Sequence, residues 1–177
     1  MKRAFTLTEV LAVIAIATTF AAISYPVFSQ VRRSARKSEC ISNLHQIGVA
    51  ISMYRSQYDG VEAGTPVEMG LPPGETLFST VTDGLKCHGT ASMGEWPLYS
   101  KTWPEPGDDQ ASQKFWAAFV NRYGSSTVMM FDANHQPSAG PVSVGWQNWT
   151  VLGLKLDTSV YAKTHRAFPL TLSWWTQ

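Results

Sequence analysis

The chain has 177 residues, of which 44% are hydrophobic and 15% charged, with 14 Lys+Arg against 13 Asp+Glu. This length provides for one domain with its own core, and the formal net charge of +1 excludes a strongly basic nucleic-acid-binding protein. The charge is unevenly distributed, because residues 1–58 carry seven basic and two acidic side chains while residues 59–177 carry seven and eleven. The composition indicates a basic N-terminal segment joined to a mildly acidic body.

The first segment is a long apolar stretch. Residues 5–28 (FTLTEVLAVIAIATTFAAISYPVF) contain a single charged side chain, Glu9. A helix of this length rises about 36 Å, which is enough to cross a hydrocarbon layer about 30 Å thick. A signal peptide has a shorter apolar centre and a cleavage site of small residues, for which Ala21-Ala22 is a poor match. We therefore predict a membrane-inserted helix over residues 5–28.

Glu9 is unusual within this apolar segment. A carboxylate in such a helix costs about 2.5–3.5 kcal/mol at the bilayer centre and less near the helix end. Two interpretations remain open. Either Glu9 lies close enough to the interface to stay hydrated, or it pairs with a positive group from another subunit, such as an α-amino group created by cleavage just upstream.

Residues 3–9 (RAFTLTE) resemble the prepilin-type processing and methylation signal of type IV pilins and type II secretion pseudopilins. In that family a short basic leader is removed before a Phe, the new N-terminus is methylated, and the fifth mature residue is Glu. The resemblance implies a leader peptide over residues 1–4, cleavage between Ala4 and Phe5, N-methylation of Phe5 and an assembly role for Glu9. The family usually has Gly where this chain has Ala4.

Pro26 fits the same resemblance, because it would be the twenty-second mature residue, where many pilins carry proline. A proline inside a helix removes one backbone hydrogen bond and bends the helix. We predict a helix kink at Pro26, and the alternative is that the helix ends there at the membrane surface.

Residues 29–59 continue the helix in amphipathic form, and Asp59-Gly60 ends it with turn chemistry. The run CISNLHQIGVAISMYRSQYDG (40–60) is similar to prepilin-type proteins named for a C-terminal H-x9-DG motif. That motif is degenerate here, because Thr158 follows Asp157 and Gln147 stands ten residues before it. The apolar face of the continuation consists of Ile41, Leu44, Ile47, Ile51, Tyr54 and Tyr58.

The body, residues 60–177, contains short runs typical of β-strands and one helical pattern over residues 111–123. The β-like runs are 77–81, 127–131, 142–146, 149–156 and 170–175. The helical pattern places Phe115, Trp116, Phe119, Val120 and Tyr123 on one face. We predict an α+β fold of the pilin-like kind, with a long N-terminal α-helix, transmembrane in its first half and packed by its second half against a small antiparallel β-sheet.

Both cysteines, Cys40 and Cys87, lie in the part expected to be exported. Two cysteines of one domain in an oxidising compartment favour a disulfide, and closing this loop contributes roughly 3–4 kcal/mol. The alternative is two free, buried thiols. A metal site formed with His45 and His88 is not expected, because positions 40 and 45 diverge on a helix and adjacent ligands are poorly spaced.

Two further groups of residues have both a structural and a functional interpretation. Asp108-Asp109 suit calcium, which some secretion pseudopilins bind, but we favour charge complementarity at the start of the following helix. For the seven tryptophans we favour packing, with a subunit, sugar or surface contact as the alternative for Trp174-Trp175. The sequence lacks G-x-S-x-G, P-loop and dinucleotide-binding patterns, so we expect no enzyme and no cofactor.

The residues and the resemblance together predict a pilin or pseudopilin, a structural subunit of a type IV pilus-like or type II secretion filament. Its expected partners are a prepilin peptidase/methyltransferase, other pilin-like subunits and the inner membrane, with no nucleic acid. It would span the inner membrane once, with an extracytoplasmic body, and then enter a cell-surface or periplasmic filament. The alternative is a single-pass membrane-anchored extracytoplasmic binding protein that uses exposed tryptophans.

Overall fold

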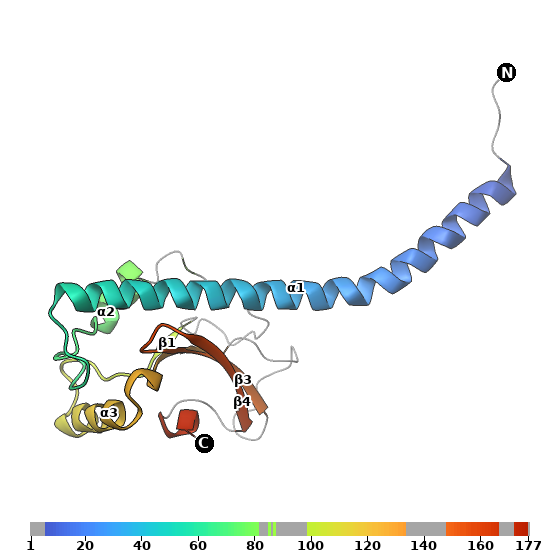
Figure 1. Ribbon diagram of the computed structural model, residues 1–177. Helices are drawn as coiled ribbons and strands as arrows, with labels where there is room; N and C mark the ends of the chain where they lie inside the picture. Colours follow the sequence, from blue (N-terminus) through green and yellow to red (C-terminus); the bar gives the residue numbers. More distant parts are fainter. Residues whose placement is uncertain are drawn as a thin grey trace. The chain divides into compact units, whose positions relative to one another are not determined.

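The computed structural model describes residues 6–81, 85, 87, 99–133, 148–166 and 172–176. The chain divides into two compact units, Met1–Arg36 and Lys37–Gln177, and one continuous helix, α1 (Leu7–Gln57), runs through the boundary between them (Figure 1). The expectation of a long N-terminal helix is therefore confirmed.

The second unit contains a four-stranded antiparallel sheet in the order β1-β2-β3-β4. Its strands are β1 (Ser100–Lys101), β2 (Val128–Asp132), β3 (Asn148–Lys155) and β4 (Val160–Arg166). Its helical elements are α2 (Gly74–Thr76), the π-helix η1 (Leu77–Val81), α3 (Gln110–Tyr123) and the 3₁₀-helices η2 (Gly124–Ser126) and η3 (Leu172–Thr176). The predicted α+β fold with a small antiparallel sheet is confirmed.

The second half of α1 packs on one face of this sheet (Figure 1). The helix contributes four fully buried apolar side chains at helical spacing, and each stabilises the fold by about 1.5–3 kcal/mol. They are Cys40, Leu44, Ile47 and Ile51. The sheet contributes Met129, Met130, Leu152 and Leu154 to the same core.

The opposite face of the sheet is covered by η3. Val151 points away from α1 because successive strand residues alternate between the two faces, and it packs with Trp174 and Trp175 in a second cluster. Gly153 makes this contact possible, since a Cβ there would lie 2.7 Å from Trp175 Cζ3 and 3.0 Å from Tyr161 Cε1. The sheet is thus enclosed by apolar groups on both faces.

Several predicted side-chain positions are wrong. Ile41 on α1 is 36% exposed, and Tyr58, which follows the end of α1, is 63% exposed, because the buried face of α1 is centred on Cys40 and Leu44. On α3, Phe115 is 60% exposed while its neighbour Trp116 is fully buried. Both helices were predicted correctly, and only the face that each one buries differs from the prediction.

Two predicted strands are also wrong. Residues 77–81, predicted as a strand, form the π-helix η1. This helix continues α2, because Leu77 N–H donates a hydrogen bond to Pro73 O at 2.9 Å. Residues 172–176, most of which were predicted as a strand, form the 3₁₀-helix η3. Short apolar runs do not distinguish a strand from a helical turn. The predicted strand over 142–146 lies outside the described residues, and β1 and β4 were not predicted.

Candidate assembly site

The first half of α1 is apolar and exposed on every side. Helix α1 is long and apolar enough to cross a membrane, and none of its most apolar window is buried; a signal sequence near the N-terminus has the same properties. The large exposed apolar side chains are Leu7, Val10, Leu11, Val13, Ile14, Ile16, Phe20, Ile23, Tyr25, Val27, Phe28 and Val31. A surface of this kind requires lipid or other apolar helices around it.

Glu9 lies in the first turn of α1 and forms a reciprocal pair with Thr6. The backbone N–H and the hydroxyl of Thr6 both donate to Glu9 Oε2 at 2.8 Å, and Glu9 N–H donates to Thr6 Oγ1 at 3.3 Å. This is a capping box, which satisfies backbone donors at a helix start. The T-x-x-E spacing could have revealed the role of Thr6, which our sequence analysis missed.

The same arrangement occurs in the body, where Thr65 and Glu68 stabilise a turn. The N–H and hydroxyl of Thr65 donate to Glu68 Oε2 at 2.7 and 2.8 Å, and these bonds lower the pKa of Glu68. Because the pair recurs outside the apolar segment, the local bonds of Glu9 identify a helix-capping role that is separate from any role in assembly.

The remaining predicted residues of the N-terminal segment stay predictions. Ala4 and Phe5 lie outside the described residues. Pro26 lies inside α1, whose helical assignment continues through it, so the helix does not end there. Ser29 Oγ donates to the Pro26 carbonyl at 2.8 Å, a local bond that fits a helix interior.

The predicted disulfide between Cys40 and Cys87 is present and joins positions that are 47 apart in sequence. Both cysteines are buried, and the Asp132 carboxylate lies within 4.8 Å of the sulfur atoms. These three side chains have suitable spacing for a metal ion, but the disulfide already occupies both sulfurs. His45 contacts the turn between β3 and β4 instead, and His88 lies outside the described residues.

Asp108 and Asp109 organise the start of α3. Asp109 is the N-cap, and its Oδ1 accepts hydrogen bonds from Ala111 N–H and Ser112 N–H, both at 2.9 Å. Bonds from Ser112 lower the pKa of Asp109. Asp108 Oδ2 accepts a hydrogen bond from Glu105 N–H at 2.7 Å. Asp109 therefore has the expected role at the start of α3, whereas Asp108 closes the turn that precedes the helix.

The tryptophans whose side chains the structure describes are buried. Trp103, Trp116, Trp174 and Trp175 are all at most 7% exposed. The C-terminal pair covers the sheet, and Lys163 Nζ donates to Trp174 O at 3.0 Å. Trp174 and Trp175 therefore pack on the sheet, as we favoured, and leave little exposed ring surface for a subunit contact.

The comparisons with known proteins give one match. The model of a family described as "Protein of unknown function (DUF1559)" matches residues 29–65, about a fifth of the chain. These residues include the half of α1 that packs on the sheet and the turn after it. No curated protein and no solved structure matches the chain.

Proposed function

We propose that this protein is a filament subunit of the type IV pilin or type II secretion pseudopilin kind, anchored in the inner membrane before assembly. The observation that carries the proposal is the division of α1 into two halves of different environment. Its first half exposes apolar side chains all round, and its second half buries one face against the body. One helix thereby carries both an apolar segment long enough for a membrane span and an amphipathic segment that packs on the folded body.

Three further observations support the proposal. The signal-like residues 3–9 overlap the start of α1 at Leu7. The matched family model covers residues 29–65, which include the segment that resembles the H-x9-DG subgroup of prepilin-type proteins. The disulfide between Cys40 and Cys87 fits a body outside the cytoplasm, where disulfides persist. A catalytic role has no part in the proposal.

Glu9 would serve assembly through its charge. Within a bundle of apolar helices an unpaired carboxylate is costly, so Glu9 would be driven to pair with the Phe5 α-amino group of a neighbouring subunit. This pairing fixes the axial register between subunits. The capping bonds from Thr6 engage the same carboxylate in the single chain, and the two roles therefore need separate tests.

The first experiment is mass spectrometry of the N-terminus of the protein isolated from its native membrane. We expect a first peptide that begins at N-methylated Phe5. An intact Met1 would contradict prepilin processing and favour a plain membrane anchor. A cut near Ala22 would contradict it in favour of a signal sequence.

The second experiment separates the two roles of Glu9 by assembly of variants in cells. Glu9→Ala should leave the protein in the membrane and reduce its incorporation into filaments, whereas Thr6→Val removes the hydroxyl of the capping box and should retain incorporation. Glu62→Ala, in the body, is the control for loss of one carboxylate. Normal assembly of Glu9→Ala, or equal defects in Glu9→Ala and Thr6→Val, would contradict a charge-pairing role.

A further inference from the structure

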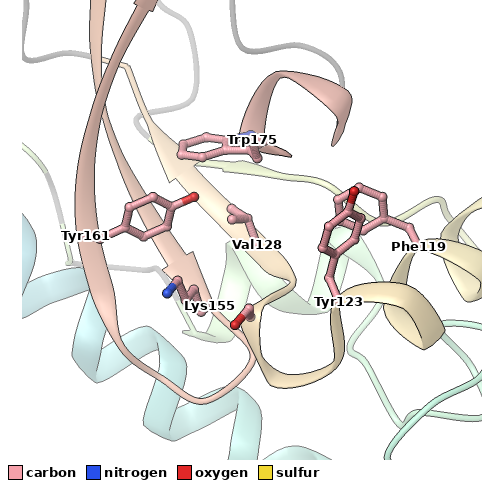
Figure 2. A pocket seen from close by; sticks show the side chains of 7 residues that line it. Phe119, Tyr123, Val128, Lys155, Tyr161 and Trp175 are labelled. Carbon is pink, nitrogen blue, oxygen red and sulfur yellow. The ribbon is translucent and has the colours of Figure 1, made fainter. Parts of the chain in front are cut away.

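A pocket of about 240 Å³ lies in the second unit between the end of α3, the sheet and η3. Figure 2 shows Val128 at its floor, Trp175 across the top, Tyr161 and Lys155 on one side and Phe119 and Tyr123 on the other. The lining residues, which also include Ser126, come from six elements between Gln110 and Thr176. Four of the side chains are aromatic, and one is cationic.

Trp175 is held above the pocket by the absence of a side chain at Gly153. Its ring lies 5.7 Å from that of Tyr161, edge to face, and 5.8 Å from that of Phe131. Trp175 is only 7% exposed, and its indole Nε1 has no hydrogen-bond partner in the described part of the chain. A buried donor of this kind usually finds a partner.

Lys155 is the charged residue of the pocket lining. Its Nζ lies 4.9 Å from the centroid of the Tyr161 ring. Asp157 is the carboxylate that acts on it electrostatically, but Asp157 Oδ1 accepts a hydrogen bond from Ser159 N–H at 2.9 Å within the turn. Within the described residues, Lys155 has no carboxylate at ion-pair distance.

We propose that this pocket binds a single aromatic ring that carries a carboxylate. Aromatic walls favour a planar ring in stacked or edge-to-face contact, and the Lys155 ammonium favours a negative charge at its edge. Repulsion from the Lys155 ammonium disfavours a cationic ligand. An uncharged apolar ligand would remove water from the ammonium without giving it a partner, and this desolvation would weaken binding. The volume is below the 300 Å³ or so of pockets for drug-sized ligands, which limits the ligand to about one ring.

A saccharide fits the same walls less well. Sugars need a polar partner for nearly every hydroxyl group, whereas the polar groups of this lining, on Tyr123, Ser126, Lys155 and Tyr161, alternate with the apolar surfaces of Phe119, Val128 and Trp175. The Tyr161 hydroxyl is protonated at neutral pH, since its ordinary pKa of about 10 is already well above 7 and burial raises the pKa further, to about 12. It is therefore available as a neutral hydrogen-bond donor to a carboxylate. The site is independent of N-terminal processing and goes beyond the proposed role in a filament.

The test is a titration of the full chain, in a detergent without aromatic or sugar groups, with phenylacetate. Binding is followed by tryptophan fluorescence and by ligand-observed NMR. We expect saturable binding with a Kd of about 1 mM or tighter. Phenylacetamide, which has the same ring without the charge, should bind about tenfold more weakly.

Variants assign the charge to Lys155. Lys155→Met should weaken phenylacetate binding about tenfold, and Lys155→Arg should retain it. Lys114→Met removes an exposed charge of α3 outside the pocket, and it should bind as the wild type does. Should Lys155→Met fail to fold, the comparison of phenylacetate with phenylacetamide on the wild-type chain decides the role of charge.

Three results would overturn the proposal. The first is no saturable binding of phenylacetate up to about 10 mM. The second is equal affinity for phenylacetate and phenylacetamide, or for the wild type and a folded Lys155→Met variant. The third is tighter binding of glucuronate than of phenylacetate, which would assign the pocket to an acidic sugar instead.

Discussion

His45 Nδ1 donates a hydrogen bond of 3.0 Å to the Thr158 carbonyl, and so joins α1 to the turn between β3 and β4 across 113 residues of sequence. Thr158 has a φ of +66°, in the left-handed region that β-branched residues seldom adopt. It stands where the H-x9-DG resemblance has glycine. The histidine and the helix thus hold a turn whose backbone is unfavourable for its own side chain.

Thr158→Gly should therefore stabilise the protein. A residue with a Cβ costs about 1–2 kcal/mol in the left-handed conformation, and glycine removes this cost. Glycine also raises the conformational entropy of the unfolded chain, which offsets part of the gain in stability. We expect the free energy of unfolding to rise by about 1 kcal/mol, measured by urea denaturation of the full chain in detergent. Thr158→Ala keeps a Cβ and should gain less. The Thr158 side chain packs close to Gly48, since a Cβ added at Gly48 would lie 3.3 Å from Thr158 Cβ. A less stable glycine variant would show that this packing stabilises the fold by more than the backbone strain at Thr158 costs.

Gly153→Ala should have the opposite effect. The new methyl group would meet Trp175 and Tyr161, whose rings cannot move without opening the second cluster. Overpacking of this kind costs about 1–3 kcal/mol, and the displaced indole should change the tryptophan emission. The matched control is Gly107→Ala, at a position with no atom within 4 Å of an added Cβ. Equal stability of Gly153→Ala and wild type would contradict the close approach of Trp175 to the sheet.

Loss of the disulfide should lower the free energy of unfolding by about 3–4 kcal/mol, since the cross-link closes a long loop in the unfolded chain. The double variant Cys40→Ala/Cys87→Ala and the reduced wild type should unfold at similarly low urea concentrations. Reductant should not affect the double variant, which serves as the control. An unchanged midpoint for wild-type protein whose thiols are shown to be free would refute this contribution.

Glu105 should make stability depend on pH. Burial by itself raises the pKa of Glu105, but hydrogen bonds from Gly74 N–H and Lys101, both at 3.0 Å, outweigh burial and hold the pKa below its ordinary value. The bonds of the charged form therefore contribute fully above the ordinary pKa of about 4.3, and this stability is lost as the pH falls through the lower, folded-state pKa.

Urea denaturation at several pH values tests this dependence. Glu105→Gln should be less stable than wild type at pH 7, and the difference should shrink on acidification. Glu75→Gln, in the adjoining helix α2, is the control for loss of one negative charge. A constant difference between Glu105→Gln and wild type at all pH values would show that the charge of Glu105 does not stabilise the fold.

The sequence was sufficient to predict the elements whose pattern is long or locally encoded. The apolar run of residues 5–28 and the helical spacing after it predict α1, and the strands near 127–131 and 149–156 and the helix over 111–123 follow from their periodicity. The cap at Asp109 and the disulfide could also be predicted. The helices, strands and cap depend on residues that are close in sequence. The disulfide could be predicted because the chain has only two cysteines, which can pair whatever their separation in sequence.

Other features were decided by tertiary packing. Residues 77–81 and 172–176 became helical turns because apolar runs of about five residues suit either backbone, and their packing partners selected one. The rotation of α3 that buries Trp116 and exposes Phe115 was selected in the same way. The pocket beneath Trp175 exists only because six elements meet there. Contacts between residues this distant in sequence leave no local pattern, so only the folded chain reveals them.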